Sequence, residues 1–179
     1  ELDESGAIVA AKTRTTTYCY DAAGDLRSIT GPKGAAGFSC PSATAWPYTP
    51  TAQPYTTKLG YDAAHRQISA TDPLGRTSAS EYDANGWTTK TIDPLGNERT
   101  TEYDERGQAV KMVEPFTDSP LRKLTTLTEY DALGNVKREI SPRAFDVGSP
   151  GNYVNYVSSY DYDALGQLVR VLLPKGGTE

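Results

Sequence analysis

The side chains that could perform chemistry in this sequence are few and widely separated. The single histidine, His65, is the one residue that could act as the base of a Ser–His–Asp or Cys–His arrangement. Asp161 and Asp163 alternate in the stretch "YDYD", which would place two carboxylates on one side of a strand. Calcium prefers six or more oxygen ligands, so two carboxylates fall far short. The glycines follow no phosphate-binding pattern. We therefore expect no enzyme, no catalytic residue, no metal and no cofactor.

The composition limits the classes of partner. The 179 residues carry a net charge of −5, and 37% of them are hydrophobic with tyrosine included. An acidic chain without clustered Lys and Arg argues against nucleic acid as a partner. No run of about 18 apolar residues occurs, so we expect no membrane span. The acidic first residues, "ELDESGAIVAAK", do not resemble a signal peptide.

A repeat organises the sequence. The pair Tyr–Asp recurs at positions 20, 61, 82, 103, 130 and 162, twice at an interval of 21 residues, and a proline lies twelve residues after every one of these six tyrosines. A glycine lies four residues after the tyrosine in five copies, and often another glycine lies two residues after the proline. The positions to which we assign a structural role in turns are Tyr20, Asp21, Gly24, Pro32, Tyr61, Asp62, Pro73, Gly75, Tyr82, Asp83, Gly86, Pro94, Gly96, Tyr103, Asp104, Gly107, Pro115, Tyr130, Asp131, Gly134, Pro142, Tyr162, Asp163, Gly166 and Pro174.

Two turn signatures alternate within the repeat, Asp-x-x-Gly after the tyrosine and Asp-Pro-Leu-Gly between repeats. Both are typical of a type I turn that ends on a residue with positive φ. The six or seven residues between the turns, such as 87–92 and 97–103, have the length of strands. The sequence therefore predicts an all-β fold, a repetitive antiparallel β-hairpin meander, over a single segment 1–179.

Two details of the sequence test the regular spacing of the predicted hairpins. His65 replaces the glycine of its copy, so we expect it in a left-handed conformation. Cys19 and Cys40 are 21 residues apart. In strict register that spacing would put them two strands, or about 9.6 Å, apart, too far for a disulfide. Only the irregular insertion between them could permit a bridge, so the pairing stays open.

Insertions interrupt the repeat at 33–60, which is rich in proline, and at 116–127 and 143–157. In the first insertion Trp46, Tyr48 and Tyr55 are a candidate ligand surface, because prolines and aromatic residues make semi-rigid loops. The alternative is that these rings cap the sheet locally.

The repeated motifs "YDANGWTTKTIDPLGNERTTEYDERG" (82–107), "YDALGNVKREISP" (130–142) and "YDALGQLVRVLLP" (162–174) resemble the RHS or YD-repeat family. The resemblance covers nearly the whole chain except 35–58. It implies a strip of the spiral sheet from which bacterial RHS proteins and the similar insecticidal toxin-complex components build a hollow shell. Related repeats occur in wall-associated proteins and in teneurins.

The resemblance implies a non-catalytic structural segment, whose partners are the rest of the shell and an enclosed C-terminal toxin or effector domain. It also implies a secreted or cell-surface bacterial protein, exported as part of a larger one. Family members carry an aspartyl autoprotease, and Asp72 and Asp93 stand in stretches that share a few letters with it, although ordinary turns explain the same letters. The alternative function is a cell-surface module that binds carbohydrate or another partner.

The two ends of an open sheet have a consequence of their own. Bare edge strands pair readily with other chains, so we expect self-association through an edge.

Overall fold

The computed structural model describes residues 14–35, 38–40, 54–116, 119–145 and 153–174. Twelve strands and two short 3-10 helices make up the regular structure of these residues, and the strands follow one another in chain order. The prediction of an all-β meander of antiparallel hairpins is confirmed. The contacts divide the chain into two compact units, Glu1–Ser78 and Ala79–Glu179. That the whole of 1–179 is a single segment stays a prediction.

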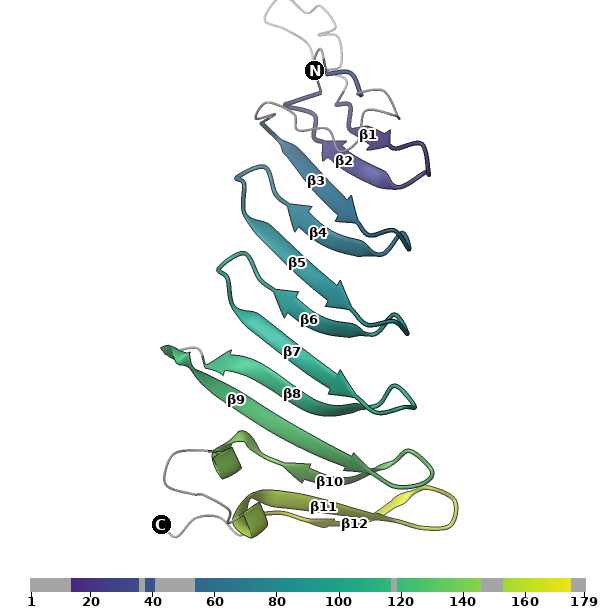
Figure 1. Ribbon diagram of the computed structural model, residues 1–179, viewed down its shortest axis with the longest axis vertical. Helices are drawn as coiled ribbons and strands as arrows, with labels where there is room; N and C mark the ends of the chain where they lie inside the picture. Colours follow the sequence, from purple (N-terminus) through teal and green to yellow (C-terminus); the bar gives the residue numbers. More distant parts are fainter. Residues whose placement is uncertain (1–13, 36–37, 41–53, 117–118, 146–152, 175–179) are drawn as a thin grey trace, which may run out of the picture. The chain divides into compact units, whose positions relative to one another are not determined.

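The first unit contains β1 (Thr17–Tyr20), β2 (Leu26–Thr30), β3 (Thr56–Tyr61) and β4 (Gln67–Thr71), and the chain then turns into β5 (Thr77–Tyr82). Each strand from β1 to β4 is antiparallel to the next (Figure 1). The side-chain hydroxyls of Thr71 and Thr77 lie 2.8 Å apart across the turn that leaves β4.

The second unit continues the pattern from β5 onward. Its strands are β6 (Thr88–Ile92), β7 (Glu98–Tyr103), β8 (Ala109–Phe116), β9 (Ser119–Tyr130), β10 (Val136–Ile140), β11 (Val157–Tyr162) and β12 (Leu168–Leu172). The 3-10 helices η1 (Pro142–Phe145) and η2 (Tyr153–Tyr156) lie between β10 and β11. Every strand of this unit pairs antiparallel with its successor.

The repeated tyrosine marks a fixed irregularity in the pairing. The register shifts by one residue at the tyrosine that ends each odd strand from β1 to β7 and at the end of β11, as between Glu81 and Tyr82. The extra residue lies in the even strand, as Thr89 does between Thr88 and Lys90, three residues beyond the left-handed residue of the turn. Each of these hairpins therefore combines a tight turn with a separate β-bulge in its second strand.

The sequence prediction is wrong for Pro115, which lies inside β8 opposite Lys123 of β9 rather than in a turn. Here the insertion lengthens the hairpin, so that β9 occupies most of 116–127. Pairing of β8 with β7 ends at Val113 and Thr100, so Pro115 lies beyond the part of β8 that is paired on both sides. A proline, which has no backbone N–H, is tolerated at such an edge position.

The other prolines at this offset also differ among themselves. Pro73 and Pro94 follow the aspartate of a turn, whereas Pro142 opens η1 and Pro174 follows β12. Pro32 lies in a separate turn, in which the backbone N–H of Gly34 donates to the carbonyl of Gly31 over 2.9 Å. The common offset thus marks where an even strand ends, and the following insertion decides what comes next.

Burial is concentrated in the first unit. Among the described residues only Cys19, Ser28, Thr30, Thr56 and Ala144 are buried. The first four occupy one face of β1–β3, since Cys19 is opposite Ser28 and Thr30 is opposite Thr56. The hydroxyls of Thr30 and Thr56 lie 2.9 Å apart, which satisfies both buried groups. Elsewhere the sheet is thin and partly exposed, consistent with the low apolar content.

Candidate functional site

The hairpin turns carry the residues that the sequence singled out. Eight described turns share one geometry: the aspartate backbone N–H donates to the carbonyl four residues later over 2.9–3.0 Å, and the fourth turn residue donates back to the aspartate carbonyl over 2.9–3.1 Å. These turns begin at Asp21, Asp62, Asp72, Asp83, Asp93, Asp104, Asp131 and Asp163. The fourth residue has positive φ in each case, 77–92° for the glycines and 61° for His65. His65 thus adopts the left-handed conformation expected from its position.

The carboxylate of each turn aspartate also accepts hydrogen bonds from its own loop. In Asp93, Oδ1 accepts from the backbone N–H groups of Leu95 and Asn97, over 2.8 and 2.9 Å, and Oδ2 accepts from the Asn97 side chain over 2.8 Å. The Asn97 amide is the main cause that lowers the pKa of Asp93, and the backbone donors add to it. Hydrogen bonds from Asn135 lower the pKa of Asp131 in the same way. These carboxylates stay ionised and hold the loop in shape.

Asp72 and Asp93, which the sequence analysis compared with the autoprotease of the family, also hold a turn in shape. Asp72 Oδ2 accepts from Arg76 Nε over 2.7 Å, and this hydrogen bond is the largest cause that lowers the Asp72 pKa. Asp93 has the same turn geometry, with Asn97 in place of the arginine. Their contacts explain the two aspartates as turn residues, the interpretation that the sequence favoured.

The two aspartates considered for metal binding have separate partners. Asp161 pairs with Arg170 across β11 and β12, Oδ2 to Nε 2.5 Å. Asp163 Oδ1 accepts from the backbone N–H groups of Leu165 and Gln167. Within the described ranges no group of three or more His, Cys, Asp or Glu side chains could hold a metal ion.

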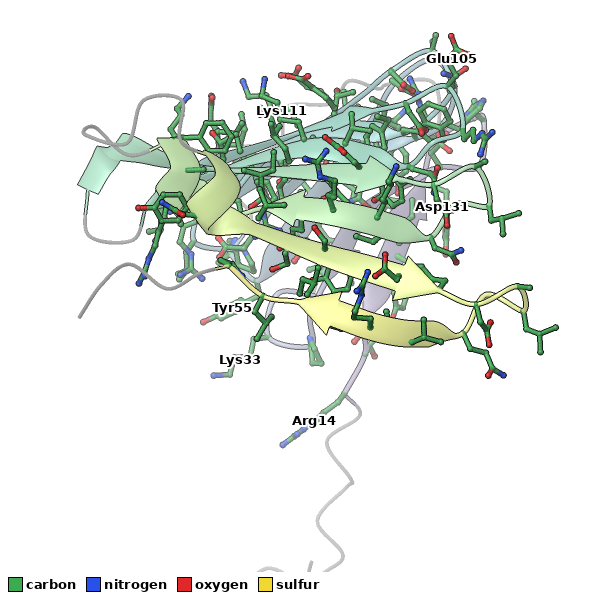
Figure 2. All side chains as sticks on the ribbon, turned by 90° about the horizontal axis from the view of Figure 1, so that it is seen from below. Arg14, Lys33, Tyr55, Glu105, Lys111 and Asp131 are labelled. Atoms are coloured by element: carbon green, nitrogen blue, oxygen red, sulfur yellow. A yellow bond between two sulfur atoms is a disulfide. The ribbon has the colours of Figure 1, made fainter. Side chains whose placement is uncertain are left out.

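Pairs of oppositely charged side chains form a row along the second unit, and the sequence analysis did not predict this row. The residue before the repeated tyrosine is acidic, and its direct cross-strand partner is basic: Glu81–Lys90, Glu102–Lys111, Glu129–Arg138 and Asp161–Arg170. Their charged atoms lie 3.7, 2.6, 3.1 and 2.5 Å apart. Lys111, labelled in Figure 2, belongs to this row. An acid one residue before each tyrosine and a base eight residues after it were the available signal.

The repeated tyrosines connect one hairpin to the previous one. The hydroxyls of Tyr103, Tyr130 and Tyr162 donate to the backbone carbonyls of Thr88, Ala109 and Val136 over 2.9–3.0 Å. Each acceptor is the first residue of the preceding even strand. These three tyrosines therefore join successive repeats of the second unit.

Neighbouring hairpin tips also touch each other. In the second unit Gln108 Nε2 donates to the Gly134 carbonyl over 3.0 Å, and Arg106 Nη1 donates to the Ala132 carbonyl over 2.8 Å. Trp87 lies over Gly107 so closely that an added Cβ would come within 2.7 Å of the indole ring. Figure 2 shows Glu105 and Asp131 in two of these tips.

The candidate ligand surface is only partly described. Trp46 and Tyr48 lie outside the described residues. Tyr55 is 48% exposed and has φ 67°, rare for an aromatic residue. The ammonium of Lys33 lies 5.8 Å from the ring centroid of Tyr55, and the two side chains lie side by side in Figure 2. That aromatic face already has a cationic neighbour.

Cys19 and Cys40 form a disulfide, with Cα atoms 5.4 Å apart. The strict-register estimate of two strands does not hold, because Cys40 lies in the insertion and not in a strand. After β2 the chain returns to β1, and the bridge joins the insertion to the buried Cys19. The spacing of the two cysteines does not decide the bridge, since the path of the insertion cannot be derived from it.

Residues 82–119 match the family model described as RHS Repeat. This confirms the resemblance over that segment, from the last residue of β5 to the first residue of β9. No curated protein matches the chain. No helix among the described residues is long and apolar enough to cross a membrane.

Solved structures extend the likeness to the fold. The crystal structure of TcdB2-TccC3 superposes with a TM-score of 0.53 at 16% identity, over 89% of this chain and 9% of that one. The Photorhabdus luminescens Tc holotoxin pore with a mutated TccC3 is also similar, at 18% identity over 83% of this chain and 8% of that one, with a TM-score of 0.36. The chain therefore spans about a tenth of these proteins, and the first superposition shows that it shares a fold with a segment of TcdB2-TccC3.

Proposed function

We propose that this chain is a non-catalytic wall segment of an RHS shell that encloses a C-terminal toxin or effector domain. The observation that carries the proposal is the way in which each repeat is tied to the next. Strand pairing, tyrosine-to-carbonyl hydrogen bonds and tip-to-tip contacts all join successive hairpins. A sheet joined in this way can be lengthened by further repeats without changing its parts.

The chemistry of the turns supports a mechanical role. In the geometry that the eight turns share, the aspartate carboxylates accept hydrogen bonds from backbone N–H groups. These carboxylates therefore stabilise the backbone of their own turns. The disulfide supports an exported protein, because such bonds persist mainly in oxidising compartments. The proposed partners are the remaining shell and its enclosed domain.

Protease protection tests the proposal in the full-length protein that carries this segment. We expect its C-terminal domain to resist protease when the shell is intact. Tyr130→Asp, which removes the bond to Ala109 and places a charge between two hairpins, should expose that domain to cleavage. Tyr20→Asp is the matched control, because Tyr20 is 52% exposed. A C-terminal domain cut equally fast in all three proteins would contradict enclosure.

The carbohydrate alternative has one supporting observation, the exposed ring of Tyr55, a residue whose backbone has positive φ. A glycan array with the whole chain separates the two functions. Micromolar binding that is lost in Tyr55→Ala and kept in Tyr20→Ala would favour the binding module. Absence of binding in the wild type would leave the wall segment as the better account.

A further inference from the structure

The tips of the first two hairpins are joined by two titratable side chains. His65 Nδ1, in the β3–β4 turn, lies 2.9 Å from Asp25 Oδ2, at the end of the β1–β2 turn. The Asp25 side chain is 13% exposed and the His65 side chain is 59% exposed. Both residues belong to the first unit, so this contact lies within one compact body.

The turn itself does not explain why a histidine occupies this position. The seven other turns of this geometry have glycine there, since a side chain is unfavourable at positive φ. His65 adopts φ 61° in spite of that cost. The side chain makes its hydrogen bond outside its own turn, to Asp25.

Other neighbouring tips make an equivalent contact without a titratable pair. Gln108 of one tip donates to the carbonyl of Gly134 in the next, and Trp87 lies over Gly107. In each case the residue after one turn reaches the fourth turn residue of the next hairpin. Asp25 and His65 occupy these same two positions, so the first junction makes the common contact with an acid and a base.

We propose that Asp25 and His65 form a proton-controlled latch between the first two hairpin tips, which holds most strongly when the imidazole is protonated. Protonated His65 contributes an ion pair and a hydrogen bond to the Asp25 carboxylate. Neutral His65 retains a hydrogen bond to Asp25 only as the Nδ1–H tautomer and loses the charge attraction. The latch therefore loosens, without the strands having to separate, as the pH rises.

The charged groups around His65 favour the protonated form. The hydrogen bond that His65 donates to Asp25 is the main cause that raises the pKa of His65 above 6.5, and the charges of Asp25 and Asp21 add to it. Burial and the Arg27 charge on β2 act in the opposite direction. In its own turn, Asp62 is paired with Arg66, Oδ2 to Nε 2.7 Å.

The sign of the effect follows from this raised pKa. A base that binds its proton more tightly in the folded chain stabilises the fold fully below its unfolded pKa. That contribution is lost as the pH rises through the higher pKa of the folded state. The latch is therefore expected to be closed in mildly acidic solution and to weaken from neutral to alkaline pH. Solvent exposure of His65 keeps the effect small.

An NMR titration of the intact chain measures the latch directly. His65 is the single histidine, so its imidazole signals need no assignment by mutation. We expect a pKa above 6.5 in the wild type and a lower one in Asp25→Asn, which keeps a hydrogen-bond acceptor but removes the charge. A wild-type value at or below 6.5, or equal values in the two proteins, would overturn the proposal.

Thermal unfolding provides a second measurement, with His65→Asn as the matched variant. Asparagine tolerates positive φ and can donate a hydrogen bond to Asp25, but it does not titrate. We expect the wild type to gain about 1–2 °C in Tm relative to His65→Asn at about pH 6, and to lose that gain by about pH 9. In the Asp25→Asn background the gain should vanish at both pH values. A Tm difference that does not change with pH would show that His65 is only a packing residue.

Discussion

Glycine occupies most of the turn positions with positive φ for two separable physical reasons. One is the backbone conformation, which every L side chain resists. The other is space, and it applies only at some positions. A Cβ on Gly96 would meet nothing within 4 Å, whereas a Cβ on Gly107 would lie 2.7 Å from the Trp87 ring. The φ values of the two are almost equal, 84° and 81°.

This pair allows the two costs to be measured apart. We expect Gly96→Ala to lower the free energy of unfolding by about 1–2 kcal/mol, the cost of a left-handed side chain. Gly107→Ala should cost about 1–3 kcal/mol more, because the indole ring must also move. Urea unfolding followed by circular dichroism measures both. Equal losses would mean that Trp87 does not pack against that tip.

The pKa values of the turn aspartates predict how the stability of the protein changes in acid. Their hydrogen bonds lower the pKa values of Asp62, Asp72, Asp93 and Asp131 below 3.8. A depressed carboxyl pKa stabilises the fold above the unfolded value, and that stabilisation is lost as the pH falls through the folded value.

We therefore expect Tm to be flat above about pH 5 and to fall steeply below about pH 4. Asp93→Asn removes one of these titrations, while asparagine can still form the turn. Its Tm should be lower than that of the wild type at neutral pH, and the difference should shrink in acid. A difference that stays constant from neutral pH into acid would show that the Asp93 charge does not contribute.

Among the larger elements, the insertion after β2 changes the first unit most. In the second unit the residue before each tyrosine is acidic and faces a base. At the corresponding positions the first unit has Cys19 opposite Ser28 and Gly60 opposite Ser69. A Cβ at Gly60 would lie 2.3 Å from the Ser69 hydroxyl, so a side chain there would require that hydroxyl to rotate away. A disulfide and close packing thus replace the exposed row of charges.

Loss of this disulfide should destabilise the first unit selectively. We expect Cys40→Ser to cost about 2–4 kcal/mol, the usual effect of opening a loop of this order. Hydrogen exchange measured by mass spectrometry should show faster exchange in β1–β3 and unchanged exchange in β9–β12, which serve as the internal control. The double variant Cys19→Ser/Cys40→Ser tests whether a free thiol is responsible. Faster exchange throughout the chain would contradict a local role.

For the molecule as a whole, the last described strand is the most exposed. All five residues of β12, "LVRVL", are exposed, and four of them are apolar. In the described chain β12 pairs with β11 alone. An apolar edge of this kind is a template for pairing with another chain.

We expect the isolated chain to associate through this edge. Light scattering should show a weight-average mass that rises with concentration. Val171→Lys, which places a charge in the edge strand, should lower that mass, whereas Lys137→Arg on β10 should leave it unchanged. A monomer at every concentration tested would contradict association through β12.

Much of the architecture could be predicted from the sequence because its rules are local. Asp, Pro and Gly at regular offsets specify tight turns, and the turns specify hairpins. The prediction failed at Pro115, where an insertion lengthens two strands instead of forming a loop. Offsets counted along the chain cannot distinguish these outcomes, since both preserve the same distance from the tyrosine.

The sequence alone determined the order and kind of the hairpins, and the left-handed conformation of His65, because each depends on residues within a few positions of one another. Only the tertiary structure decided which distant groups meet: Cys40 with Cys19, His65 with Asp25, and the hydroxyls of three repeated tyrosines, Tyr103, Tyr130 and Tyr162, with the preceding hairpin. Those contacts depend on how neighbouring strands are staggered and where an insertion returns to the sheet. Both depend on pairing and packing between segments far apart in the chain, and local propensity carries no information about such contacts.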